Sequence, residues 1–367
     1  MHLRSTAGFH NVDADRRFVD EMRSVLASWK RAKRMDNQKR QAVRISALLQ
    51  VATPPIPNVD AHFATASEAE KLVAPNVFFN GPIFTENQQS LPLQTVDQFL
   101  AEFYDDNVLA DIQDPAMKIT PCTRRVRISQ VKARLLKPKK PNEKPWNLLE
   151  IATHADEGIK PSWLNREDCR LITKLKIPEA QKTVQRRGYL PGYKEVERWA
   201  LVAQAGALTN PHQDSHGYST FITCNQGEIG FGWLSHPTAE ERAGWERSSD
   251  DYIGGRWRYI VIRPGQTVYF PAGTVHFIFR LPSKGNTLAF GGHVLRCSNL
   301  VHWIKTLLAE KRADNISNED LSASAPGYLD TVETFLNQAQ KQGKAGKWGG
   351  MGAIKEFLRL KAEFMAT

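Results

Sequence analysis

The chain has 367 residues, of which 41% are hydrophobic and 24% charged, so a globular protein with a sizeable core is predicted rather than a disordered or fibrous one. Its formal net charge of +10 suits a polyanionic partner such as nucleic acid. There is no apolar run of the roughly 20 residues that a membrane span needs, no C-x-x-C pair and no secretory signal, so we expect an intracellular protein without a membrane partner.

The amino-terminal part of the sequence reads as mainly helical. Apolar residues recur at helical spacing from about 13 to 51, which predicts one long helix. Residues 51–60 are rich in proline and are expected to form a linker or an irregular docking loop. A second, shorter helix is predicted over 96–112.

Two basic stretches lie in the same part of the chain. The first runs from Lys30 to Arg34 on the long predicted helix, and the second runs from Arg124 to Lys144 and includes Lys139. A solvated surface, a nuclear-import signal and a phosphate-binding surface are all compatible with such stretches. A nucleic-acid partner bound through the basic N-terminal region therefore stays open, and a nuclear or cytoplasmic location is expected, with the nucleus favoured.

Breaker residues divide the sequence into regions. A proline- and lysine-rich connector over 135–145 is expected to separate a basic helical region, residues 1–134, from a compact domain over 146–312. Residues 313–367 are expected to form a C-terminal helical region.

Short strands separated by Gly, Pro and Asn dominate the compact domain, which is typical of a mainly β fold, a β-sandwich or jelly roll with flanking helices. A helix capped by Asn165 is expected over 165–175, and a long polar loop over 236–255. Strands are predicted over 146–152, 198–206, 218–224, 229–235, 258–265, 267–271, 274–281 and 287–295, and C-terminal helices over 299–312, 328–340 and 351–364.

The stretch NPHQDSHG, residues 210–217, places histidines and a carboxylate close together. Alternate side chains of an extended strand share a face, so His212 and Asp214 point the same way and could chelate one metal ion. His276, shortly after the turn Pro271-Ala272-Gly273, is the best third ligand. Two histidines and one carboxylate favour non-haem Fe(II), with open positions for oxygen chemistry, over a catalytic zinc ion.

Three stretches extend this pattern: TNPHQDSHGYSTFITCNQGEIGFGWLS, RPGQTVYFPAGTVHFIFR and NTLAFGGHVLRCSNL. With them the region from about 195 to 308 resembles a JmjC domain, and more narrowly the branch of plant-homeodomain-associated histone lysine demethylases and fungal JmjC-domain proteins. The resemblance implies a double-stranded β-helix (jelly roll, cupin-like) core flanked by N-terminal and C-terminal helices. It also implies Fe(II) bound by His212, Asp214 and His276, and 2-oxoglutarate bound in part by the hydroxyl of Thr209.

One position departs from the pattern of that family. A lysine usually follows the Gly-Glu pair and binds the distal carboxylate of 2-oxoglutarate, whereas here Ile229 follows Gly227-Glu228. Arg280, on the predicted strand of the third ligand and with the same parity, is the nearest replacement, and His293 and Arg296 are alternatives. A guanidinium suits a carboxylate because it can donate two parallel hydrogen bonds.

The expected function is oxygenation of a protein substrate, with a histone tail as one candidate. Hydroxylation of a C–H bond is the expected reaction, and a hydroxylated N-methyl group would leave as formaldehyde. Because Ile229 replaces the lysine, a catalytically inactive JmjC-like scaffold acting in chromatin stays open, as does a cupin-type metal enzyme without 2-oxoglutarate. Core packing is expected for the tryptophans, although aromatic faces could also form a methyl-lysine cage: Trp233, Trp245, Trp257 and Trp303.

Overall fold

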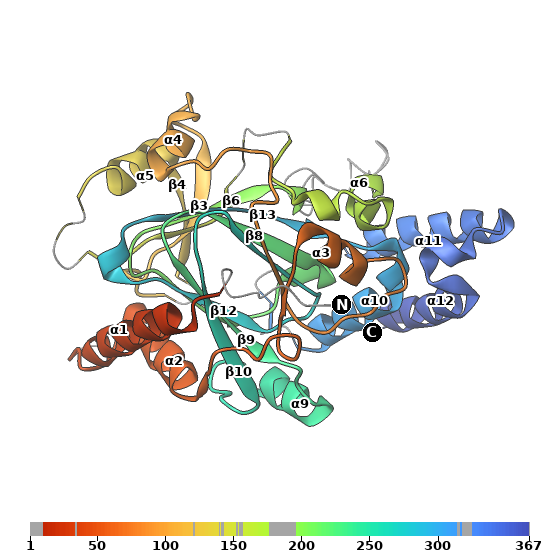
Figure 1. Ribbon diagram of the computed structural model, residues 1–367, viewed down its shortest axis with the longest axis horizontal. Helices are drawn as coiled ribbons and strands as arrows, with labels where there is room; N and C mark the ends of the chain where they lie inside the picture. The colour runs from red at the N-terminus through yellow and green to blue at the C-terminus, as the bar shows by residue number, and fades with distance from the viewer. Residues whose placement is uncertain are drawn as a thin grey trace.

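The computed structural model describes residues 10–33, 35–119, 122–138, 140, 143–151, 153, 157–175, 196–313, 316–317 and 325–366. Arg34 and Lys139 of the two basic stretches lie outside these ranges, as does residue 195. Two β-sheets form the centre of the molecule, and helices lie against their outer faces and beyond one end (Figure 1).

The larger sheet has nine strands within the described residues, in the order β1-β2-β11-β8-β13-β6-β5-β3-β4. Neighbouring strands of this sheet are antiparallel, except for β1 and β2, which run parallel. The strands are β1 (His62–Phe63), β2 (Ile83–Glu86), β3 (Leu109–Gln113), β4 (Thr123–Arg127), β5 (Asn147–Ile151), β6 (Trp199–Ala203), β8 (Ser219–Gln226), β11 (Gln266–Phe270) and β13 (Thr287–Val294).

The smaller sheet has four antiparallel strands among the residues described, in the order β10-β9-β12-β7. They are β7 (Leu208–His212), β9 (Ile229–Ser235), β10 (Arg256–Ile262) and β12 (His276–Phe279). The two sheets enclose an apolar interior to which both contribute alternate side chains.

Strand β9 illustrates how the sequence builds this interior. Phe231 and Trp233 point between the sheets, where they are 0% and 1% exposed. The alternating Gly230 and Gly232 face outward, and a Cβ at Gly232 would lie 2.1 Å from the ring of Phe277. The glycines therefore let aromatic rings of β12 lie directly over the backbone of β9.

Helices cover the outer faces of both sheets. The helices α1 and α2 pack with the outer face of the smaller sheet, α4 and α5 lie beside β3 and β4, and α10 to α12 extend from the opposite end (Figure 1). No helix of the described ranges is long and apolar enough to cross a membrane. The helices are α1 (Val12–Lys30), α2 (Asn37–Val51), α3 (Ala66–Leu72), α4 (Val96–Ala101), α5 (Ile128–Leu135), α6 (Leu171–Lys174), α9 (Ala239–Arg247), α10 (Leu300–Arg312), α11 (Ala325–Lys341) and α12 (Gly350–Ala366).

The predicted strands and the C-terminal helices are present, with ends shifted by a few residues. The single long helix over 13–51 is wrong, because Asp36 accepts a hydrogen bond from the backbone N–H of Lys39 (2.9 Å) and begins a second helix. The break lets α1 and α2 fold back on one another and share one apolar cluster.

Three other helix predictions need correction. The segment 96–112 forms α4 and then strand β3, in which Ala110 and Ile112 alternate toward the core. Asn165 does not cap a helix, since 3₁₀ turns surround it and only the short α6 follows. The polar loop over 236–255 contains α9, which Thr238 and Glu241 begin with a capping box.

The region before residue 135 is not purely helical. It contributes β1, β2, β3 and β4 to the larger sheet, where β2 pairs with β11 and β3 pairs with β5. The sheet therefore runs across the expected boundary at 135–145.

Candidate metal centre

The three predicted metal ligands lie together at one end of the smaller sheet. His212 is the last residue of β7, His276 is the first residue of β12, and the antiparallel register pairs the two directly. One ligand atom from each of these residues and from Asp214 lies within 4.8 Å of the others. The Nε2 atoms of His212 and His276 are 3.6 and 3.7 Å from Oδ1 of Asp214.

Hydrogen bonds orient both imidazoles for binding through Nε2. Nδ1 of His212 lies 2.9 Å from the carbonyl oxygen of Asn210, and Nδ1 of His276 lies 3.1 Å from that of Thr274. A carbonyl oxygen only accepts, so each Nδ1 carries the proton and each Nε2 presents its lone pair. Burial, followed by the neighbouring charge of His212, lowers the pKa of His276 to about 4, which keeps this ring neutral at ordinary pH.

The carboxylate of Asp214 is held by a short chain of donors. Nδ1 of His293 lies 2.9 Å from Oγ1 of Thr220, and that hydroxyl donates to Oδ2 of Asp214, which leaves Oδ1 facing the two histidines. Burial would raise the pKa of Asp214, but interactions with the protonated forms of His276, His293 and His212 and the Thr220 hydrogen bond outweigh burial and lower it. Asp214 is therefore ionised, as a metal ligand must be.

A β-bulge brings Thr209 to the same interior face. The register between β12 and β7 shifts from His276↔His212 to Ile278↔Thr209, so β7 has one extra residue in this interval. Pro211 lies in this interval, where its missing N–H costs no ladder bond. Thr209 thus faces inward beside Ile278, and its hydroxyl accepts a hydrogen bond from Nδ2 of Asn147 (3.3 Å).

Arg280 is a buried cation on the same side of the sheet. It is 1% exposed, its Nε donates to Oγ1 of Thr287 (2.7 Å), and its Nη1 has no hydrogen-bond partner. No carboxylate among the described residues pairs with it, and burial lowers its pKa to about 10. The register of β12 with β9 ends at Phe279↔Gly230, and one further step along both strands sets Arg280 opposite Ile229.

The other two candidate replacements are placed differently. Arg296 is committed elsewhere, because it pairs with Asp168 (3.1 Å) and donates to the carbonyl oxygen of Ala74 (2.6 Å). His293 lies near the candidate metal ligands and not near Arg280, because its Nδ1 contacts the hydroxyl of Thr220 next to Asp214. Of the three, Arg280 has the free donor.

Two features of the site had no clear signal in the sequence. Thr220 approaches Asp214 only because the chain reverses between them. Glu150 sits at a bulge of β5 with φ of +38°, a strained value for a residue with a Cβ, and its Oε1 is 3.6 Å from Nε2 of His293. The sequence hint for Glu150 was a charged residue between the apolar Leu149 and Ile151 of a predicted buried strand.

Several interior donors remain unpartnered among the described residues. Besides Nη1 of Arg280, the indole N–H groups of Trp199 and Trp233 are buried without a hydrogen-bond acceptor. Both indoles belong to the apolar cluster between the sheets, and the ring of Trp199 lies 5.5 Å from that of His293. The indole N–H groups of Trp245 and Trp257, in the cluster on the outer face of the smaller sheet, are also buried without an acceptor in the described part of the chain, so an unpartnered indole alone does not mark a ligand site.

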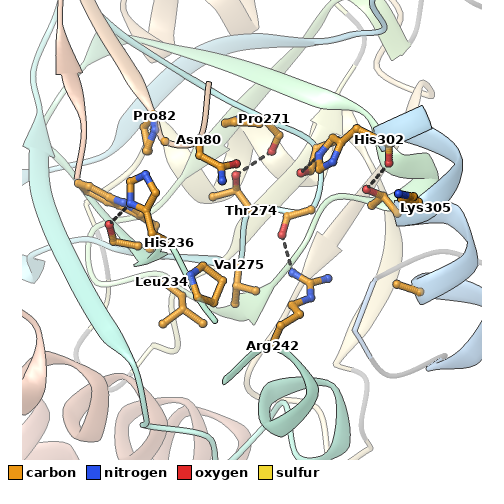
Figure 2. A pocket seen from close by; sticks show the side chains of 18 of the residues that line it. Asn80, Pro82, Leu234, His236, Arg242, Pro271, Thr274, Val275, His302 and Lys305 are labelled. Atoms are coloured by element: carbon orange, nitrogen blue, oxygen red, sulfur yellow. Dashed lines mark hydrogen bonds between the residues drawn. The ribbon is translucent and has the colours of Figure 1, made fainter. Parts of the chain in front are cut away.

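A cavity of about 330 Å³ lies between the turn before His276 and the helices α9 and α10 (Figure 2). None of the three candidate ligands lines it. Thr274 connects the two places, since it lines the cavity and its carbonyl oxygen orients His276. The charged and imidazole groups around the cavity include Arg242, Glu246, His236, His302 and Lys305.

Five basic side chains of the second stretch form ion pairs within the chain, and two of their guanidinium groups also stack on Trp146. This stretch therefore offers fewer free cations to a polyanion than its composition suggests. The ion pairs are Arg124–Asp114 (2.8 Å), Arg125–Asp111 (3.0 Å), Lys132–Asp106 (2.8 Å), Arg134–Glu143 (2.8 Å) and Lys144–Asp36 (3.1 Å).

The four tryptophans considered for a methyl-lysine cage are core residues. Their exposures are 1% for Trp233, 0% for Trp245, 1% for Trp257 and 2% for Trp303. The features that point to a function are therefore the triad and Arg280.

A scan of the chain against models of known protein families finds no model that matches it.

Proposed function

We propose that this protein is an Fe(II)- and 2-oxoglutarate-dependent oxygenase that hydroxylates or demethylates a protein side chain. The observation that carries the proposal is the convergence of His212, Asp214 and His276, with Nε2 of each histidine within 3.7 Å of Oδ1 of Asp214. Two histidines and one carboxylate are the donor set of non-haem Fe(II) oxygenases. The two sheets are proposed to be the halves of a double-stranded β-helix, or jelly roll.

The inner face of β12 and β7 has an order that suits a dicarboxylate. His276 and His212 lie at one end, Thr209 is opposite Ile278 in the middle, and Arg280 lies beyond. One carboxylate of 2-oxoglutarate would lie at the metal, and the other would accept hydrogen bonds from Arg280. The unpartnered Nη1 of Arg280 supports this placement, because a buried guanidinium without an anion is otherwise a cost to the fold.

Fe(II) bound with 2-oxoglutarate and O₂ would supply the oxidising power to convert a C–H bond to C–OH, while 2-oxoglutarate becomes succinate and CO₂. The chain's own residues hold the ligand set and exclude water. Thr220 and the carbonyl oxygens of Asn210 and Thr274 fix the orientation of the ligands. The surrounding cluster of aromatic and aliphatic side chains provides a dry interior.

A histone tail is the first candidate substrate, through the resemblance of the three motifs to histone lysine demethylases. Because the four tryptophans are core residues, a methyl-lysine group would have to be recognised by other side chains. Stable hydroxylation of an unmethylated side chain is therefore an equal candidate for the reaction.

The test is succinate formation from 2-oxoglutarate with added Fe(II) and ascorbate, measured for wild type, His212→Ala and His62→Ala. His62 lies on the edge strand β1 and serves as the matched histidine control. We expect wild type and His62→Ala to form succinate at equal rates and His212→Ala to fall to the background without protein. Equal background for all three proteins would reject the oxygenase and favour a scaffold without catalysis.

A binding measurement separates a 2-oxoglutarate enzyme from a cupin-type metal enzyme. Under anaerobic conditions the Fe(II)-loaded protein should develop a metal-to-ligand charge-transfer band on titration with 2-oxoglutarate. Fe(II) binding without this band would contradict the co-substrate assignment and leave a metal enzyme of another kind.

A further inference from the structure

Gln213, between two of the candidate ligands, is buried and fully engaged. Its side chain is on the opposite side of the chain from His212 and Asp214, and the residue is 0% exposed. Its Nε2 donates to Oε1 of Glu310 (3.1 Å), and its Oε1 accepts from Nη2 of Arg242. One amide thus joins a carboxylate of α10 to a guanidinium of α9.

Glu310 also holds the turn that follows Asp214. Its carboxylate accepts the backbone N–H groups of His216 (2.9 Å) and Gly217 (3.0 Å), both of which have left-handed φ values, 62° and 60°. A Cβ at Gly217 would lie 2.9 Å from Trp303 of the same helix. The reversal that returns the chain to Asp214 is therefore shaped by α10.

Arg242 holds the other ligand-bearing segment. Its Nη1 donates to the carbonyl oxygen of Gly273 (2.6 Å), and its Nε pairs with Glu246 (2.7 Å) on the same helix. Gly273 precedes Thr274, whose carbonyl oxygen orients His276. Figure 2 shows Arg242 reaching this turn from α9. The guanidinium consequently contacts both the loop of Asp214, through Gln213, and the turn before His276.

We propose that Gln213 is a positioning residue whose amide fixes the spacing between the loop that carries Asp214 and the turn that precedes His276. The inference rests on the proposed metal centre and goes beyond it, since Gln213 touches no metal. Groups that orient metal ligands affect metal affinity by roughly 10–100-fold. Without the amide, Arg242 and Glu310 would lose their common partner, and the two segments could shift relative to one another.

The test is a swap of the acid and the amide. Variants Gln213→Leu, Gln213→Glu, Glu310→Gln and the double variant Gln213→Glu/Glu310→Gln are compared for Mn(II) affinity by calorimetry and for the Co(II) absorption spectrum. In the double variant the new carboxylate can accept from Arg242 and from the nitrogen of the new amide, and the amide oxygen can accept from the backbone N–H of His216. The backbone N–H of Gly217 loses its acceptor, because it shares Oε1 of Glu310 with Gln213 in the wild type. Gln41→Leu, a buried glutamine of α2, is the control.

We expect Gln213→Leu and Gln213→Glu to weaken Mn(II) binding by about 10–100-fold and to change the Co(II) spectrum at saturation. The double variant should recover most of the lost affinity and return the spectrum toward that of the wild type, and Gln41→Leu should leave both unchanged. If Gln213→Leu fails to fold, recovery in the folded double variant still decides, because it restores both side-chain partners of residue 213. Wild-type affinity in both single Gln213 variants would overturn the positioning role alone. Absence of Mn(II) and Co(II) binding by the wild type would overturn the metal centre with it.

Discussion

Arg280 is a cation in a place where an isolated charge is unfavourable. It is 1% exposed, and among the described residues its hydrogen-bond partner is the neutral hydroxyl of Thr287. Cys224 lies near it, but burial raises the pKa of that thiol to about 12, so it supplies no negative charge at neutral pH. An arginine retained in this position is most simply explained by an anionic ligand.

Replacement of Arg280 by methionine should have opposite effects on stability and on ligand binding. Removing the buried charge should raise the free energy of unfolding of the ligand-free protein by roughly 1–4 kcal/mol, and losing the hydrogen bond to Thr287 should lower it by about 1 kcal/mol. Its affinity for 2-oxoglutarate should fall by about 30-fold or more, because a buried charge pair loses one partner. Urea unfolding and calorimetry with Mn(II)-loaded protein measure the two effects. Unchanged 2-oxoglutarate affinity would contradict the assignment.

Ile229 and Arg280 should be exchangeable as sources of the cation. The register sets them opposite one another on the interior face, so Ile229→Lys alone would place a second cation beside Arg280 and destabilise the fold. Combined with Arg280→Met, the new lysine should restore part of the 2-oxoglutarate affinity. The same calorimetric titration measures the recovery, and a double variant that binds no better than Arg280→Met would show that the two positions do not serve one ligand.

At this scale the sequence predicts the candidate ligands but not their supports. Alternation on one strand was the wrong reason for grouping His212 with Asp214, because β7 ends at His212 and Asp214 lies in the turn beyond it, although the two residues do lie together with His276. Thr220 and Glu310 could not be predicted, because they reach the loop of Asp214 from a neighbouring strand and a distant helix. Thr209 required a bulge, which no local rule of strand alternation predicts.

The elements around the site differ in how far local sequence determines them. The strand IGFGWLS is predicted to the residue, since its alternating glycine and aromatic side chains have one consistent arrangement. The pattern over 13–51 predicts a single helix because both halves are apolar at the same spacing, whereas the cap at Asp36 and the packing of α1 on α2 divide it. Hydrophobic periodicity does not predict helix α9, because its sequence is mostly charged and Trp245 is its only buried residue.

Helix α10 makes the stability of the protein depend on pH through Glu310. Burial raises the pKa of Glu310 to about 8 against hydrogen bonds from Gly217, His216 and Gln213, while the unfolded chain ionises near 4.5. Between these two values the unfolded state has released a proton that the folded state retains. The free energy of unfolding should therefore fall as pH rises, with a limiting slope of about 1.4 kcal/mol per pH unit from this group.

The variant Glu310→Gln removes this contribution. Urea unfolding of wild type and variant at pH 5, 6, 7 and 8 should show the wild type losing stability relative to the variant as pH rises. Parallel curves for the two proteins would indicate that Glu310 is already ionised at pH 5 in the folded state.

On the scale of the whole molecule, the amino-terminal region is part of the fold and not an attachment to it. Asp15 of α1 is fully buried, accepts the backbone N–H of Val261 (3.0 Å) and pairs with Arg263 (2.8 Å) on the smaller sheet. Strand β2 lies along β11 in the larger sheet. Breaks in composition at 135–145 suggested a domain boundary, but composition does not record which strands pair across it.

The fragment 146–367 should therefore fail to fold on its own. Removing the first 145 residues leaves β11 and β5 as unpaired edges and exposes the outer apolar face of the smaller sheet, including Trp257 and Phe277. The full chain should be monodisperse and lose its near-ultraviolet circular dichroism in a cooperative transition, whereas the fragment should aggregate or lack that signal. Circular dichroism and sedimentation velocity decide the matter. A monomeric fragment that unfolds cooperatively and binds Mn(II) as tightly as the full chain would mean that residues 146–367 form an independent domain, to which the amino-terminal strands and helices are only an addition.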